Sequence, residues 1–156
     1  MSSPMFALPN GYTIQEYRIE AMIGAGGFGL TYLAHDANLN TKVAIKEYLP
    51  ADFASRSEDQ TVQPKSSAAQ PTFEWGLKRF LDESRTLASF RHPNIVRILG
   101  YGEEDDCRYY AMELIQGKSL QDAMDDGRRF DLLIALGSVL VPTGSILQMT
   151  NSLRLS

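Results

Sequence analysis

The sequence predicts a domain of the α+β class, in which one long amphipathic helix packs against an antiparallel β-sheet. Along the 156 residues, five segments show the alternation of apolar and polar residues, or the β-branched content, that is typical of strands. They are residues 17–23, 30–36, 42–49, 95–102 and 108–115. A further segment, residues 72–89, has apolar residues at helical spacing. Because short turns join most of these strands, we expect a five-stranded antiparallel sheet.

The composition favours a single soluble domain. Apolar residues make up 44% and charged residues 22% of the chain, which is long enough for one domain with its core. The formal charge of -4 and the pI near 5.1 include no basic block, so we expect no nucleic-acid partner. Cys107 is the only cysteine, which excludes an internal disulfide and a cysteine-rich zinc site. The first residues lack the pattern of a secretory signal, and we expect a cytoplasmic protein.

The uncharged segment of residues 132–153 is long enough to span a bilayer. It is interrupted by a proline, two glycines and several Ser, Thr, Asn and Gln residues, which weaken its apolar character. A membrane span is the alternative, but we expect this segment not to cross a membrane.

The first three expected strands form a meander. Residues 17–23 place Tyr17, Ile19, Ala21 and Ile23 on one face, which is typical of a half-buried strand. A turn-forming segment, DANLN, separates the second strand from the third. These strands therefore follow one another in antiparallel order.

Residues 24–29, between the first two strands, read GAGGFG. Glycine has no Cβ, so such a segment adopts positive φ easily and lets backbone amides approach a ligand closely. A ligand-binding loop and a flexible hairpin tip are both compatible with these residues alone. A dinucleotide-binding fold is excluded, because residues 30–46 read as strand, turn and strand. They leave no room for the helix that such a fold needs after its glycine loop. The phosphate loop G-x-x-x-x-G-K-[ST] is also absent from the sequence, which leaves a glycine-rich hairpin.

The third expected strand carries a lysine beside a small residue. Ala44 and Lys46 are two residues apart and share one face, whereas Val43 and Ile45 point to the other face, into the core. Ala44 leaves space for a flat ring, and Lys46 can offer its charge to phosphate oxygens. The alternative for Lys46 is a solvated lysine near a strand end.

A long loop is expected before the helix. Residues 47–71 are rich in Ser, Asp, Gln, Ala and Pro and predict a loop, with a short ordered piece in the segment YLPADFA. Thr72 is the expected N-cap of the helix, and His92-Pro93 ends it. A short helix is expected at residues 119–126, with Ser119 as its cap.

Glu83 lies within the apolar stripe of the long helix. Phe80, Glu83 and Leu87 have the spacing i, i+3 and i+7, so the carboxylate is expected on the buried face. Because an unpaired buried carboxylate is costly, Glu83 needs a cation. Arg79, four residues earlier, and Lys46 are the two candidates. A pair with Lys46 would hold the lysine in position for the phosphates of a nucleotide.

Several segments together resemble the N-terminal lobe of the eukaryotic-like protein kinases, especially bacterial serine/threonine kinases. They are IGAGGFGLTYLAHD, VAIK, the helix with Glu83, HPNIVRILGYG and YYAMELIQGKSL. The resemblance covers residues 17–124, with the motifs in the family's order. It implies a kinase-like N-lobe and hinge at residues 17–118, after an N-terminal extension at residues 1–16. Residues 119–156 would begin an incomplete C-lobe with short helices and an aberrant tail.

The resemblance implies an ATP site built from the glycine loop, Lys46 and the hinge. The loop would cover the phosphates with Phe28 at its tip, and Lys46 would contact the α- and β-phosphates while pairing with Glu83. Ile23 would cap the adenine, and Met112 falls at the family's gatekeeper position. The implied ATP-binding residues are Ile23, Gly24, Ala25, Gly26, Gly27, Phe28, Gly29, Thr31, Ala44, Lys46, Met112, Glu113 and Ile115.

In that arrangement the Glu113 carbonyl and the Ile115 amide would bind the adenine edge. Leu87 and Ile98 would belong to the hydrophobic spine whose assembly marks the active state. Thr31 stands where the family usually has valine, and the connection from Lys46 to Glu83 is longer than usual.

The C-terminal motifs of the family are missing. No H-R-D, D-F-G or A-P-E follows Met124, so the chain looks like a kinase cut off, or shifted out of frame, past the hinge. By this resemblance, the chain contains neither the family's catalytic base nor its protein ligands for the metal ions. Two functions follow from the resemblance. One is a part of a kinase that uses ATP and Mg²⁺ to phosphorylate Ser/Thr of a protein substrate, and the other is a noncatalytic nucleotide- or partner-binding lobe or a nonfunctional product.

Overall fold

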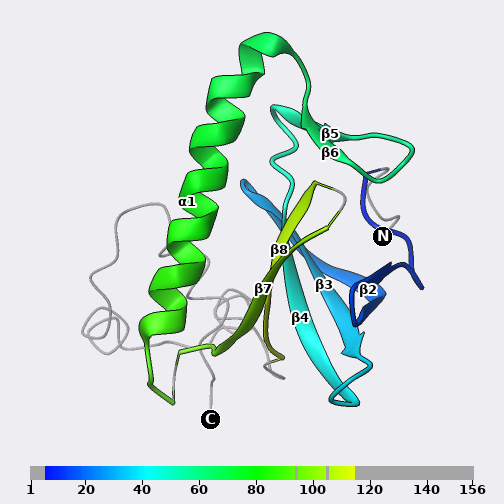
Figure 1. Ribbon diagram of the computed structural model, residues 1–156, viewed down its shortest axis with the longest axis vertical. Coiled ribbons are helices and arrows are strands. Elements are labelled where there is room, and N and C mark those ends of the chain that lie inside the picture. Colours follow the sequence, from blue (N-terminus) through cyan, green and yellow to red (C-terminus); the bar gives the residue numbers. More distant parts are fainter. Residues whose placement is uncertain (1–5, 94, 105, 115–156) are drawn as a thin grey trace, which may run out of the picture. The chain divides into compact units, whose positions relative to one another are not determined.

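An antiparallel sheet is the framework of residues 6–93, 95–104 and 106–114, which the computed structural model describes (Figure 1). Its six strands have the order β1-β2-β3-β4-β8-β7, and all neighbouring strands are antiparallel. The strands are β1 (Thr13–Ile14), β2 (Tyr17–Gly26), β3 (Gly29–Asp36), β4 (Thr41–Tyr48), β7 (Ile98–Glu104) and β8 (Cys107–Glu113). A hairpin of β5 (Ala54–Arg56) and β6 (Val62–Pro64), the 3-10 turn η1 (Ser67–Ala69) and helix α1 (Gln70–Ser89) lie between β4 and β7 in sequence.

These elements belong to one compact unit, which comprises residues 1–89 and 97–114. A second unit comprises residues 90–96 and 115–156, and only residues 90–93, 95 and 96 of it are described. In that short piece the Ile95 amide donates to the His92 carbonyl at 3.1 Å. The expected helix at residues 119–126 and the uncharged segment at residues 132–153 lie outside the described residues.

The α+β class and the antiparallel sheet with one long helix are confirmed, but the expected number of five strands is wrong. The additional strand is β1, which pairs Thr13 with Arg18 and Ile14 with Tyr17. Gln15 makes the turn between the two strands with a φ of 49°. A strand of two residues has no periodicity that a sequence pattern can reveal.

The buried face of β2 ends earlier than its sequence pattern predicts. Tyr17 and Ile19 are buried, whereas Ile23 is 52% exposed. The register with β3 shifts between Ile19 and Ala21 and again between Met22 and Gly24. Because a bulge adds a residue to one strand, it turns the following side chains away from the face that strict alternation predicts.

The expected loop at residues 47–71 is wrong in part, because it contains the β5–β6 hairpin and η1. The helix begins at Gln70 and not after an N-cap at Thr72, which lies inside α1. Ser66 caps η1 instead, and its hydroxyl accepts from the Ala69 amide at 3.2 Å. The strand expected at residues 95–102 is also displaced, since β7 begins at Ile98 and continues to Glu104.

Helix α1 runs along the sheet beside β7 and β8 (Figure 1). Tyr48, at the end of β4, packs on the rings of Phe73 and Phe80, with centroids 5.2 and 5.5 Å away. Its hydroxyl donates to the Phe73 carbonyl at 2.7 Å. A Cβ on Gly76 would lie 2.4 Å from the same hydroxyl, so this close approach of helix and strand requires glycine. The described residues include no helix that is both long and apolar enough to cross a membrane.

Candidate nucleotide site

The glycine segment forms the turn between β2 and β3. The pairs Gly24–Thr31 and Gly26–Gly29 continue the ladder almost to the tip. At Gly29 a Cβ would lie 1.7 Å from the Glu47 carbonyl oxygen, so packing alone excludes a side chain there. At Gly27, however, a Cβ would meet nothing within 4 Å. The described residues therefore leave open space at the tip, as a loop that covers a ligand requires.

Phe28 lies at the tip of this hairpin, as expected, but it is not directed wholly into solvent. Its side chain is partly buried against the hydrophobic core. Its carbonyl accepts a hydrogen bond from the Leu49 amide at 3.1 Å, directly after β4. The hairpin tip is thus attached to the strand that carries Lys46.

The strand register gathers the expected site residues on one face of the sheet. Across the β3–β4 and β4–β8 ladders, Lys46 lies opposite both Thr31 and Tyr110. Ala44, two residues before Lys46, lies opposite Met112. Directly paired residues in an antiparallel sheet project to the same face, so these five side chains share one surface.

Both faces of β4 are buried from Val43 onward, so Ala44 and Lys46 are buried as well as Val43 and Ile45, which were expected in the core. Ala44 and Lys46 are 5% and 6% exposed, and Lys46 reaches Glu83 of α1 from this face. The alternative of a solvated lysine is wrong for Lys46.

Lys46 and Glu83 form the expected ion pair. The Nζ of Lys46 lies 2.8 Å from Oε1 of Glu83, and the two side chains are 8% and 16% exposed. Glu83 therefore pairs with β4 and not with Arg79, whose guanidinium lies 5.2 Å from the ring centroid of Trp75. Because little water reaches the pair, the attraction between the two charges is weakly screened. It holds the lysine ammonium in place beside the Glu83 carboxylate.

Tyr110 is a member of this cluster that the sequence patterns do not reveal. Its hydroxyl donates to Oε1 of Glu83 at 3.1 Å, the oxygen that also accepts from Lys46. Burial and the Glu83 carboxylate raise the pKa of Tyr110, which keeps the hydroxyl protonated as a donor. In the sequence Tyr110 reads as one of two adjacent aromatic core residues, and only its pairing with Lys46 distinguishes it.

Of the expected adenine-binding residues, Thr31, Ala44 and Met112 share the face of Lys46. Thr31 and Met112 are half-buried, and Ile23 is exposed at the start of the glycine segment. Glu113 ends β8, and its amide donates to the Arg97 carbonyl at 3.0 Å. Ile115 lies outside the described residues.

The two expected spine residues have ordinary packing environments. Leu87 is 6% exposed on α1, and Ile98 packs against the core from β7. Both are compatible with a spine and with simple core packing, so their burial does not distinguish the two roles.

A second polar cluster, on the other face of β4, was not expected. Glu47 is fully buried, and both of its carboxylate oxygens accept from Nη2 of Arg56, at 2.5 and 2.6 Å. The Tyr32 hydroxyl donates to Oε2 at 2.8 Å, and the Cys107 thiol lies 2.9 Å from Oε1. Burial and the Glu47 carboxylate raise the pKa values of Tyr32 and Cys107. This cluster joins the inserted β5–β6 hairpin to the sheet.

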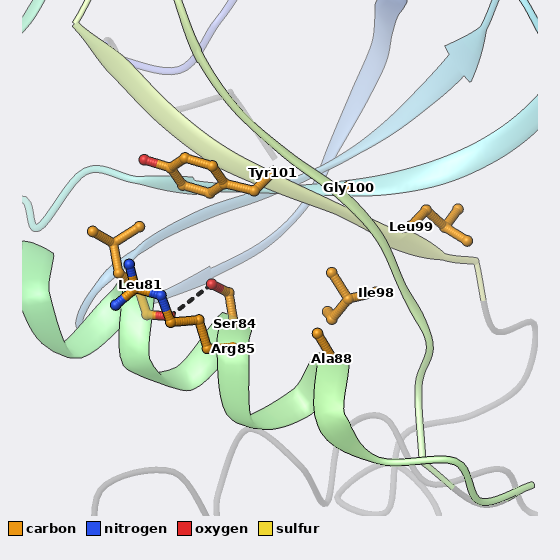
Figure 2. Close-up of a pocket in the computed structure, with 8 residues that line it drawn as sticks. All are labelled: Leu81, Ser84, Arg85, Ala88, Ile98, Leu99, Gly100 and Tyr101. Carbon is orange, nitrogen blue, oxygen red and sulfur yellow. Dashed lines mark hydrogen bonds between the residues drawn. The ribbon is translucent and has the colours of Figure 1, made fainter.

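A surface hollow of about 460 Å³ lies between α1 and β7 (Figure 2). Figure 2 shows that Leu99 points away from the helix, whereas Tyr101 lies above Leu81 and Arg85. The Ser84 hydroxyl donates within α1, to the Leu81 carbonyl at 2.8 Å. The hollow contains neither Lys46 nor a glycine of the hairpin, so it is separate from the candidate site. Among the described residues, no group of three or more His, Cys, Asp or Glu side chains could hold a metal ion.

Comparisons with known proteins agree with this geometry. The family model described as protein kinase domain matches residues 17–133. Over 106 residues the chain is 37% identical to the serine/threonine-protein kinase PrkC of Bacillus subtilis, covering 68% of this chain and 14% of the relative. It is 32% identical over 141 residues to the serine/threonine-protein kinase PknA of Mycobacterium tuberculosis, covering 87% of this chain and 28% of the relative.

A solved structure gives the same result. The structure titled "PpkA-294 apo form" superposes with a TM-score of 0.74 at 36% identity, over 77% of this chain and 43% of that chain. The chain thus spans less than a third of the length of these two curated relatives and under half of that solved chain. On this evidence the chain belongs to the protein kinase family, and its described fold is a kinase N-lobe related to those of bacterial serine/threonine kinases.

Proposed function

We propose that this chain supplies the ATP-binding lobe of a protein serine/threonine kinase, which transfers the γ-phosphate of ATP to Ser or Thr of a protein substrate. The observation that carries the proposal is the Lys46–Glu83 ion pair of 2.8 Å, formed next to the glycine hairpin. In protein kinases this pair must be in place for the lysine to act on the nucleotide phosphates. The pair supports an arrangement that is ready for ATP.

The nucleotide would lie against the face that carries Lys46. Backbone amides of the hairpin and the ammonium of Lys46 would bind the phosphates, since both offer positive charge to them. Ala44 is small enough to leave room for the adenine, and Ile23 and Met112 offer apolar contacts on either side of it. The hinge backbone at Glu113 and Ile115 would bind the adenine edge.

The residues present do not fit a protein-held magnesium ion. The described residues contain no cluster of acids for a metal ion, and residues 125–156 contain no D-F-G. Any Mg²⁺ would therefore be held by the phosphates of ATP and not by these residues. Because residues 125–156 also lack H-R-D, a noncatalytic nucleotide- or partner-binding lobe is the second candidate. We also propose a cytoplasmic location, on the basis of the single cysteine.

Calorimetric titration with Mg·ATP tests the proposal. The variant Lys46→Met keeps most of the apolar stem and removes the charge, so it should abolish or greatly weaken binding. Lys42→Met is the matched control, because Lys42 lies on the same strand and pairs only at the surface with Glu20, at 3.0 Å. ATP affinity that is equal in the wild type and Lys46→Met would contradict the proposed role of the lysine.

A further inference from the structure

We propose that Tyr110 is a positioning residue of the nucleotide site, whose hydroxyl holds the Glu83 carboxylate against Lys46 and keeps α1 docked on the sheet. The inference rests on the proposed function, because the lysine that benefits is the one assigned to the phosphates. The proposal means that a residue of β8 helps to hold together the ion pair between Lys46 of β4 and Glu83 of α1.

Two donors from neighbouring strands meet at one carboxylate oxygen. The Tyr110 hydroxyl and the Lys46 ammonium lie 3.1 and 2.8 Å from Oε1 of Glu83. The ammonium also lies 5.7 Å from the centroid of the Tyr110 ring, within the range of a cation–π interaction. Tyr110 therefore contacts both members of the ion pair.

The ring of Tyr110 holds the helix at a second point. It packs on Phe80 with a centroid distance of 5.0 Å, and both side chains are 1% exposed. Phe80 and Glu83 are three residues apart and so project from the same face of α1. Tyr110 thus contacts one turn of α1 at two points, through its ring and through its hydroxyl. Two contacts on the same turn resist both rotation and outward movement of the helix.

The neighbouring residue Tyr109 provides a matched control. It lies on the same strand and is also 1% exposed, but it projects to the other face. Its hydroxyl has no hydrogen-bond partner among the described residues and lies against Gly102. Replacing it by phenylalanine removes the same atom from an equally buried ring without touching the Lys46–Glu83 pair.

The first test compares nucleotides that differ in their phosphates. Tyr110→Phe should lower the affinity for Mg·ATP and for ADP about tenfold, as expected for the loss of a hydrogen bond to a charged group. The affinity for adenosine should stay unchanged, because adenosine has no phosphate for Lys46 to bind. Tyr109→Phe should leave all three affinities unchanged. An equal loss for adenosine and ATP in Tyr110→Phe would mean that the hydroxyl only supports the fold, and would overturn the proposal.

The second test needs no nucleotide. Hydrogen–deuterium exchange of the α1 amides should be faster at residues 80–88 in Tyr110→Phe than in the wild type, and unchanged in Tyr109→Phe. If the wild-type chain binds no ATP, the proposed function fails, and this measurement decides the role of Tyr110 independently. Exchange rates of α1 that are the same in Tyr110→Phe and the wild type would refute it.

Discussion

Replacing Arg56 should lower the free energy of unfolding of this domain more than replacing an exposed arginine does. Arg56 and Glu47 form an ion pair whose side chains are 4% and 0% exposed. Deleting one partner leaves a buried charge without compensation, which costs about 3–5 kcal/mol. Arg56 also donates to the carbonyls of Phe6 and Gln60, at 2.8 and 2.9 Å, so it ties the N-terminal segment and the β5–β6 hairpin to the sheet. We expect Arg56→Met to lose about 3–5 kcal/mol, a substantial share of the roughly 5–15 kcal/mol that is typical of a domain.

Urea denaturation followed by circular dichroism measures this loss as a fall in the transition midpoint. Arg85→Met is the control, because the Arg85–Asp82 pair is 74% and 51% exposed and such pairs contribute at most about 1 kcal/mol. In the double variant Arg56→Met with Glu47→Gln, part of the stability should return, since the amide carries no charge but still accepts from Tyr32. Equal midpoints for Arg56→Met and Arg85→Met would refute the reasoning.

Further predictions concern packing, alkaline stability and turnover. Gly76→Ala should destabilise the domain by about 1–3 kcal/mol in urea denaturation despite the higher helix propensity of alanine, because its Cβ would collide with the Tyr48 hydroxyl; Gly27→Ala, in open space, should not. Burial and nearby acids raise the pKa of Tyr17 to about 12, so the unfolded chain loses this proton first and stability should fall as the pH rises above about 10. A midpoint independent of pH between about 9 and 12 would contradict this. The purified 156-residue chain should transfer no labelled phosphate from ATP to a generic protein, because it lacks the aspartate that orients the acceptor and the residues that hold the metal ions. Incorporation that depends on Lys46 would be evidence against that expectation.

The Lys46–Glu83 contact could be predicted because each residue lies in a regular element with a clear period. Alternation along β4 places Lys46 on one face, and helical spacing places Glu83 in the apolar stripe of α1. A carboxylate in the apolar stripe needs a cation, and the sequence offers Lys46 and Arg79 as candidates. The structure decides for Lys46.

The Glu47–Arg56 pair could not be predicted in this way. Arg56 lies in a polar segment without periodicity. It meets Glu47 only because the β5–β6 hairpin folds back onto the sheet. The exposure of Ile23 could not be predicted for a related reason. The bulges that turn it outward arise from the pairing of β2 with β3 and not from the local sequence. The hydroxyl of Tyr110 finds Glu83 only through the β4–β8 register and the position of α1. Regular elements can thus be predicted from the sequence. Polar contacts that depend on strand pairing and on the position of the helix cannot.

The most direct test of the central claim is covalent labelling with an ATP analogue that carries an acyl phosphate. Such a reagent acylates an amine that lies beside the nucleotide phosphates, and mass spectrometry identifies the modified lysine. The account predicts modification at Lys46 that excess ATP prevents and that Glu83→Gln and Tyr110→Phe reduce. Labelling of Lys42 and Lys78 to the same extent as Lys46, without competition by ATP, would contradict the assignment of this face as a nucleotide site.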